Sequence, residues 1–193
     1  FTLAPGSSYD DLIEVLSEYA KAESVRLTFP EGTTAIAMAQ KMEDAGLCTA
    51  EEFLKEANTG DFSEYKFWQY VPDDKDAPDR FLKCEGYLFP DTYEFYTNMN
   101  PKEVVKKFFD NFDRKVDTEV MQEIRNLSNG LGELDNLITL ASIIQKEATD
   151  LENMKMVSSV FHNRLNNSST YPYLQSDATT NYIRDDIRSF MTQ

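Results

Sequence analysis

The sequence predicts an α+β protein in which a small strand–helix–strand module precedes a mainly helical domain. Three observations lead to this fold class. Apolar and polar residues alternate over residues 25–29, as in a half-buried strand. From Pro101 almost to the end, apolar residues recur at helical spacing. The 193 residues, of which 41% are hydrophobic, suffice to bury a core in one medium domain or in a small module joined to a larger domain.

The small module is predicted for residues 1–30. Phe1 to Ala4 resembles the end of a strand, and the serines of the turn at residues 5–8 can cap a helix. The helix after this turn has apolar residues at helical spacing, and the strand that follows has them at every second position. These residues are Leu12, Ile13, Leu16 and Tyr19 in the helix, and Val25, Leu27 and Phe29 in the strand.

Residues 31–100 predict two helices followed by irregular structure. A turn with a helix cap starts the first helix, which ends before Gly46, and Thr49 caps the second. From Phe62 to Tyr96 the chain is rich in aromatic and acidic residues, and prolines interrupt any regular element. We expect this region to be irregular and to line a site. The buried stripe of the first helix comprises Ala35, Met38, Ala39, Met42 and Ala45.

A series of helices is predicted from Pro101 onward. The segment from Leu134 to Thr149 is the most apolar of them, and Ser128-Asn129-Gly130 separates it from the helices before it. The apolar faces of the other helices comprise Val105, Phe108, Phe109, Phe112 and Val116, then Val120, Met121, Ile124 and Leu127, and finally Met154, Val157, Phe161 and Leu165.

Charge and composition argue against several functional classes. The formal net charge of −15, from 34 acidic and 19 basic residues, repels phosphate backbones and anionic lipids, which disfavours nucleic acid as a partner. A neutral sugar polymer stays compatible, because sugars are recognised through hydrogen bonds and ring stacking. The single histidine, His162, is interpreted as structural, and a zinc cluster is not expected. Cys48 and Cys84 leave both a disulfide and two buried thiols open.

Glu147 is the carboxylate that the helical pattern singles out. It follows Ile143 by four residues and Ile144 by three, and these intervals place it on the apolar side of its helix. An acid there is partly desolvated, which favours the protonated form that can donate to a glycosidic leaving oxygen. The alternative is an exposed glutamate that ends its helix or pairs with Lys146 or Arg164.

Four strings of the sequence occur in a fixed order along the chain. They are Glu85-Gly86-Tyr87-Leu88-Phe89-Pro90-Asp91-Thr92-Tyr93, Leu140-Ala141-Ser142-Ile143-Ile144-Gln145-Lys146-Glu147, Val160-Phe161-His162-Asn163-Arg164-Leu165 and Leu174-Gln175-Ser176-Asp177. In this order they resemble the signature segments of the YceG-like (MltG) endolytic murein transglycosylase family. The resemblance extends from about Phe1 to Tyr182. It implies a partial LysM-like subdomain over residues 1–30 and a YceG-like catalytic domain over residues 31–193.

The resemblance implies cleavage of peptidoglycan between N-acetylmuramic acid and N-acetylglucosamine, with formation of a 1,6-anhydro muramyl end. The family's catalytic glutamate falls on Glu147, which would act first as general acid and then as general base. One carboxyl group suffices for this reaction, because the sugar's own C6 hydroxyl replaces the activated water of paired-acid hydrolases. We expect neither a cofactor nor a metal.

Four further residues are predicted to bind the substrate. Asn163 and Gln175 would hydrogen-bond the acetamido groups, Tyr93 would stack on a sugar ring, and Asp177 would orient a donor or contact the glycan. The alternative for each is an ordinary structural role, because buried amides and tyrosines are usually satisfied by neighbouring groups.

The resemblance also carries expectations about the protein's surroundings. It implies a single transmembrane helix before Phe1, which would anchor the protein at the extracytoplasmic face of the bacterial cell membrane, and it implies peptidoglycan synthases and divisome proteins as partners. The sequence departs from the family pattern at Gln145, where relatives usually carry glutamate, and at Ala178, where proline is common. A stretch that relatives carry after Asn181-Tyr182 is missing here, so we expect the catalytic domain to be incomplete at its C-terminus.

Two other functional classes compete with this interpretation. The first is a non-catalytic peptidoglycan-binding or cell-division scaffold protein, against which the presence of Glu147 argues. The second is a pyridoxal-phosphate lyase with Lys146 as its Schiff-base residue, but the sequence shows neither a glycine-rich phosphate cradle nor alternating strands and helices.

Overall fold

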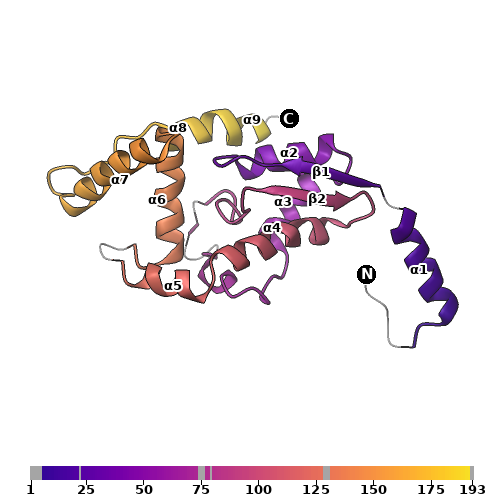
Figure 1. The fold of residues 1–193 in the computed structure, drawn as a ribbon. Helices are drawn as coiled ribbons and strands as arrows, with labels where there is room; N and C mark the ends of the chain where they lie inside the picture. The colour runs from indigo at the N-terminus through magenta and orange to yellow at the C-terminus, as the bar shows by residue number, and fades with distance from the viewer. Residues whose placement is uncertain (1–5, 22, 74–76, 79, 128–130, 192–193) are drawn as a thin grey trace.

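The computed structural model describes residues 6–21, 23–73, 77–78, 80–127 and 131–191 (Figure 1). The predicted strand at Phe1 to Ala4 and the break at Ser128-Asn129-Gly130 lie outside these residues. The elements are, in order, α1 (Tyr9–Lys21), β1 (Ser24–Thr28), α2 (Ala35–Asp44), α3 (Ala50–Thr59), the 3₁₀ helix η1 (Trp68–Tyr70), β2 (Thr92–Tyr96), α4 (Pro101–Lys115), α5 (Thr118–Arg125), α6 (Leu134–Glu147), α7 (Leu151–Asn166), α8 (Ala178–Asn181), the π-helix η2 (Tyr182–Ile187) and α9 (Arg188–Met191).

The predicted α+β class is confirmed, with a small sheet and a majority of helices. Strand β1 pairs with β2 in antiparallel register, so that Ser24 lies opposite Tyr96 and Thr28 lies opposite Thr92. The hydroxyl groups of Thr28 and Thr92, which are 64 residues apart in sequence, are hydrogen-bonded at 2.8 Å. The sheet therefore joins a strand of the segment 1–30 to a strand that lies within residues 31–193.

Helices α2, α3 and α4 form one hydrophobic core with this sheet. The Phe108 ring on α4 lies in its centre, with its centroid 5.2 Å from that of Phe29, 5.8 Å from that of Phe53 and 5.9 Å from that of Phe95. All four side chains are fully buried. Edge-to-face and tilted contacts of this kind add about 0.5–1.5 kcal/mol per pair beyond the burial of apolar area. Aromatic residues just after β1, on β2, on α3 and on α4 thus hold the sheet and the helices together.

The predicted helix starts are confirmed by their capping hydrogen bonds. The Thr34 hydroxyl accepts a hydrogen bond from the backbone N–H of Ala37 at the start of α2. Thr49 and Glu52 form a reciprocal capping box at the start of α3, in which each side chain bonds the other residue's backbone N–H. Such caps satisfy N–H groups that have no partner inside the helix, and each contributes about 1 kcal/mol.

The expectation of irregular structure from Phe62 to Tyr96 is wrong at its end. The last five residues form strand β2, in which Tyr93 and Phe95 are buried while their neighbours are exposed. The alternation of buried and exposed residues after Pro90 is the period of a strand. The prolines before it interrupt regular structure only upstream, where η1 is the short element that the structure contains.

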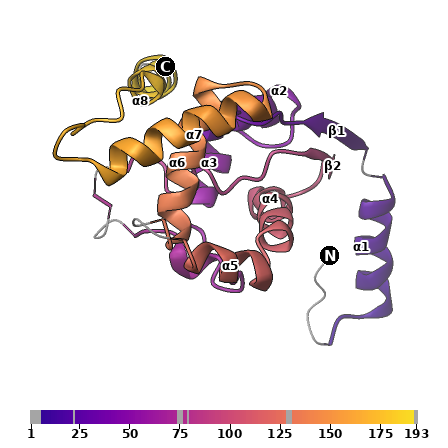
Figure 2. The same cartoon turned by 60° about the vertical axis from the view of Figure 1, so that its left-hand side comes forward.

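Helices α6 and α7 form an arm beside this core, and the chain then returns to α2. In Figures 1 and 2, α6 leads away from α5 and α7 packs near its far end. Figure 1 shows the segment from α8 to α9 running back towards α2, which η2 contacts. A second, smaller hydrophobic cluster of Leu131, Leu140 and Phe161 joins α6 to α7. The C-terminal segment therefore links the arm to the core.

Helix α1 lies apart from the rest of the described chain in both ribbon views (Figures 1 and 2). Its apolar residues Tyr9, Ile13 and Leu16 are exposed, although their spacing gives the helix a pronounced apolar side. None of the helices within the described ranges is long and apolar enough to cross a membrane.

Gly86 sets the approach between the loop before β2 and helix α6. Its backbone has φ = +90°, and a Cβ atom placed there would lie 2.5 Å from Cγ2 of Ile138 on α6. Glycine satisfies both constraints, because it adopts positive φ without steric cost and has no Cβ. Gly46, which follows the end of α2, has φ = +70°, and nothing lies within 4 Å of the position that a Cβ atom would take there.

We predict that Gly86→Ala lowers the free energy of unfolding by about 2–4 kcal/mol, because strain at positive φ and overpacking against Ile138 add. The matched variant Gly46→Ala has only the backbone strain, so we expect a loss of about 1 kcal/mol. Urea unfolding of both variants, followed by circular dichroism, measures the difference. Equal losses at the two positions would mean that α6 does not approach Gly86 closely.

Candidate active site

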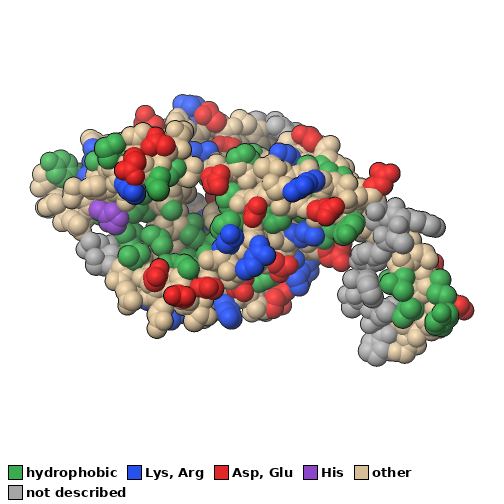
Figure 3. All heavy atoms as spheres, viewed as in Figure 1, with side chains coloured by type: hydrophobic (Ala, Val, Ile, Leu, Met, Phe, Trp, Pro, Cys, Tyr) green, Lys and Arg blue, Asp and Glu red, His purple; other side chains and the backbone are tan. Residues whose placement is uncertain are grey.

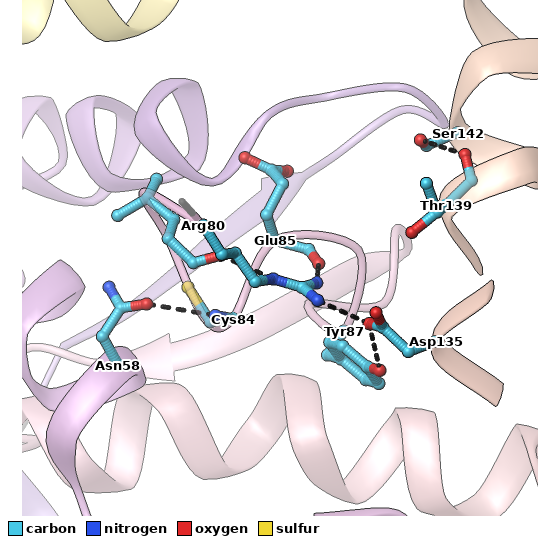
Figure 4. A network of polar contacts seen from close by, with 9 residues as sticks. Asn58, Arg80, Cys84, Glu85, Tyr87, Asp135, Thr139 and Ser142 are labelled. Carbon is cyan, nitrogen blue, oxygen red and sulfur yellow. Dashed lines mark hydrogen bonds and ion pairs between the residues drawn. The ribbon is translucent and has the colours of Figure 1, made fainter. Parts of the chain in front are cut away.

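Helix α6 is held at its first turn by a polar network around Asp135 (Figure 4). One Asp135 carboxylate oxygen accepts hydrogen bonds from Arg80 Nη1 at 2.6 Å and from the Tyr87 hydroxyl at 2.8 Å. Arg80 also donates from Nη2 to the backbone carbonyl of Glu85 at 3.0 Å. Since the Arg80 and Asp135 side chains are about one-fifth exposed, the ion pair is only partly screened by water. The network fixes α6 to the loop that precedes β2.

The side chain of Glu85 ties the C-terminal segment to the start of α2. Its carboxylate accepts hydrogen bonds from the backbone N–H of Ala35 at 3.1 and 3.2 Å and from the Tyr182 hydroxyl at 2.7 Å. Beside it, the Thr34 hydroxyl donates to Asp186 at 2.8 Å. Burial raises the pKa of Glu85, while the hydrogen bonds from Tyr182 and Ala35 partly oppose that rise. Glu85 thus anchors the C-terminal segment to the core.

Glu147 is the last residue of α6, and its side chain is exposed. The expectation that it is partly desolvated is therefore wrong. The intervals from Ile143 and Ile144 are those of the interior of a helix, but α6 ends at this residue, and both isoleucines are themselves only half-buried. The alternative of an exposed glutamate that ends its helix is what the structure shows. The ion pairs of the described residues join Glu147 neither to Lys146 nor to Arg164, which donates to the backbone carbonyl of Leu174.

The partner of Glu147 is Ser176, in the segment between α7 and α8. The Ser176 hydroxyl donates to Oε1 of Glu147 at 2.5 Å, and the backbone N–H of Ala178 donates to Ser176 Oγ at 3.2 Å. Gln175, just before it, has φ = +56°, a left-handed conformation that non-glycine residues rarely adopt. Strained backbone of this kind persists only where the surrounding structure holds it, and it is found most often at functional sites.

A shallow groove of about 310 Å³ runs beside Glu147. In the face shown in Figure 3, hydrophobic side chains gather in a hollow over α6, between α7 and α5. No group of three His, Cys, Asp or Glu side chains that would suit a metal ion occurs among the residues that the structure describes. The groove is lined by Lys146, Glu147, Ala148, Thr149, Asn153, Met156 and Val157.

The predicted substrate-binding residues differ in their exposure and in their distance along the chain from Ser176. Gln175 and Asp177 flank Ser176 and are exposed, so they lie in the segment that contacts Glu147. Asn163 is exposed on α7. No role was predicted for Ser176 from the sequence, although it lies in one of the four strings. Tyr171 and Tyr173 of the same segment were not predicted as site residues either, and they are 53% and 76% exposed.

The prediction that Tyr93 stacks on a sugar ring is wrong. Its side chain is buried in the core, where the centroid of its ring lies 4.5 Å from that of Phe108 and 6.0 Å from that of Phe95. Its hydroxyl donates to the backbone carbonyl of Phe89 at 2.6 Å. Because neighbouring rings and backbone occupy its surroundings, Tyr93 offers no free face to a ligand.

The question of a disulfide is answered by the structure, because Cys48 and Cys84 are both free thiols.

Together, the fold and the site define an α+β protein that presents a single glutamate from the end of a helix, held by a serine of a strained segment. The model of the YceG-like family matches residues 1–193, and the chain belongs to this family.

Known relatives and a solved structure resemble the chain over most of its length. The endolytic murein transglycosylase of Streptococcus pneumoniae strain D39 is 27% identical over 183 residues, covering 86% of this chain and 32% of the relative. That of Bacillus subtilis strain 168 is 26% identical over 187 residues, covering 94% of this chain and 50% of the relative. A crystal structure of a yceG-like protein from Listeria monocytogenes has a TM-score of 0.69 at 25% identity, covering 95% of this chain and 60% of that one. The chain thus spans one-third to one-half of the length of these curated relatives.

We predict a pH-dependent stability difference between the protein and its Glu85→Gln variant. A raised folded-state pKa means that the stabilising contribution of Glu85 is fully present below its ordinary pKa and is lost as the pH rises through the raised value. The neutral amide keeps a hydrogen-bond acceptor without the cost of burying a charge. The variant should therefore gain in melting temperature relative to the parent as the pH rises above about 4.5, the ordinary pKa of a glutamate.

Glu52→Gln is the matched control with the opposite sign. The hydrogen bonds from Thr49 lower the pKa of Glu52, so its contribution is present above its ordinary pKa and is lost as the pH falls. This variant should melt below the parent near neutrality and approach it in acid. A Glu85→Gln difference that does not change with pH would contradict the burial of that carboxylate.

Proposed function

We propose that the protein is a lytic transglycosylase that cleaves the glycan strands of peptidoglycan, with Glu147 as its general acid and then its general base. The observation that carries this proposal is the Glu147 carboxyl group, which is exposed beside a groove at the end of α6 and bonded by Ser176. Membership of the YceG-like family and the names of the two bacterial relatives support it.

The exposure of Glu147 suits a reaction on a polymer. A glycan strand is too long to enter a closed cavity, so its scissile bond has to reach the acid in an open groove. The glycan itself then supplies the desolvation that the free protein lacks, because a sugar ring over the carboxyl group excludes water. In this scheme the protonated acid donates to the glycosidic oxygen, and the resulting carboxylate removes the proton of the C6 hydroxyl as that oxygen closes on C1. The product is a 1,6-anhydro muramyl end.

Several finer points belong to the same proposal. Asn163, Gln175 and Asp177 are proposed to contact the glycan, and they are exposed on α7 and in the segment after it. The family resemblance supports four further proposals. Residues 1–30 are LysM-like, and a membrane anchor lies outside the described residues. The protein is extracytoplasmic, and it contacts peptidoglycan synthases and divisome proteins.

We predict that Glu147→Gln lowers the formation of anhydro-muropeptides at least about a hundredfold, because the amide keeps the size and polarity of the side chain but cannot cycle a proton. Mass spectrometry of digested peptidoglycan measures the product, and the melting temperature reports the fold. Glu123→Gln is the matched control, since Glu123 is also an exposed glutamate near the end of a helix.

Three outcomes would contradict the assignment. The variant could keep the wild-type yield of anhydro product, which would remove Glu147 from the chemistry. The wild-type product could carry a reducing muramic acid end, which would indicate hydrolysis. The wild-type protein could bind peptidoglycan without cleaving it, which would favour the alternative function of a non-catalytic binding or scaffold protein.

A further inference from the structure

We propose that Ser176 is a positioning residue for the carboxyl group of Glu147, whose Oε1 it occupies so that proton exchange with the glycan takes place at Oε2. This inference rests on the proposed function and adds a second residue to it. Ser176 lies in the fourth of the family strings, Leu174-Gln175-Ser176-Asp177.

The first support is the direction of the hydrogen bonds at Ser176. A serine hydroxyl has one donor and two acceptor sites. The backbone N–H of Ala178 donates to Oγ at 3.2 Å, which uses an acceptor site and helps to fix the hydroxyl group. The single O–H donor is then directed at Oε1 of Glu147, 2.5 Å away. None of the residues in the described ranges donates a hydrogen bond to Oε2, which leaves this oxygen to the substrate.

The second support is the way in which the backbone is held around Ser176. Gln175 adopts φ = +56°, where a glycine would fit without strain and a glutamine does not. On one side of it, the Leu174 carbonyl accepts a hydrogen bond from Arg164 on α7. On the other side, Ser176 contacts α6 through Glu147. The strained residue thus lies between two anchors, and its conformation is what directs the serine towards the end of α6.

The proton balance of the reaction leaves Ser176 unchanged. The proton on Oε2 passes to the glycosidic oxygen as the C1–O bond breaks, and the electron pair of that bond stays with the leaving oxygen. The C6 oxygen then bonds to C1, and its proton passes to Oε2, which restores the starting acid without consuming water. The Ser176 hydroxyl donates to Oε1 throughout, because this oxygen is an acceptor in both the carboxylate and the acid.

The test compares Ser176→Ala, Ser176→Thr and Ser142→Ala in the assay of anhydro-muropeptide formation. Removal of the hydroxyl should lower kcat about ten- to hundredfold, with a change in KM of less than about threefold, because positioning acts on the reacting group rather than on binding. Threonine keeps a hydroxyl on the same carbon and should restore kcat to within about threefold of wild type. Ser142 is the matched control on α6, since its exposed hydroxyl bonds only its own helix, at the Thr139 carbonyl.

A second arm separates positioning from a structural role. In the Glu147→Gln background, Ser176→Ala should cause no further loss, because the two residues act as a unit. The melting temperatures of the Ser176 variants should match that of the parent within about 2 °C, since the segment is outside the main core.

The outcomes distinguish this inference from the proposed function. If Glu147→Gln is inactive and Ser176→Ala keeps kcat within twofold of wild type, the positioning role fails and the proposed function stands. If threonine is as poor as alanine with an unchanged melting temperature, the hydroxyl is not what matters, and the inference is overturned. If Glu147→Gln itself stays active, the proposed function fails first.

Discussion

The position of helix α6 depends on the carboxylate of Asp135. Arg80 and Tyr87 both donate to one of its oxygens, and they belong to the loop that leads into β2. The 14 residues of α6 span roughly 20 Å. Glu147 therefore lies at the opposite end of the helix from the ion pair between Arg80 and Asp135. A tilt of about 10° at the first turn would move Glu147 by roughly 3 Å over that length, which is more than the proposed acid catalysis tolerates.

Contacts further along α6 limit that tilt. Near its middle, Ile138 lies against Gly86, and near its end Cγ of Gln145 lies 3.2 Å from the position that a Cβ atom of Gly32 would take. Gln145 faces the loop before α2, while Glu147 faces Ser176. Residues two apart on a helix point to different faces, so Gln145 makes a packing contact while the Glu147 carboxylate has a separate partner.

The sequence predicted those parts of the fold that depend on local patterns. Helical spacing and the caps at Thr34 and Thr49 placed most helices correctly, because both signals act within a few residues. The pairing of β1 with β2 was not predictable in this way, since it joins strands that are 64 residues apart at Thr28 and Thr92. The same limit explains why the exposure of Glu147 and the burial of Tyr93 were predicted wrongly. Periodicity assigns a side to a residue, but exposure at a helix end and burial in a distant core depend on what the rest of the chain packs there.

The segment between α7 and α8 supplies the hydrogen-bond donor to Glu147, which the C-terminal end of a helix cannot supply itself. The last turn of α6 presents backbone carbonyl groups, which accept hydrogen bonds and cannot donate to a carboxylate. A donor for Glu147 therefore has to come from another part of the chain. Ser176 supplies it, and the left-handed Gln175 together with the bond from Arg164 to Leu174 brings it there. Because the arm of α6 and α7 is tied back to the core through Tyr182 and Glu85, the end of α6, the serine and the core are held as one unit.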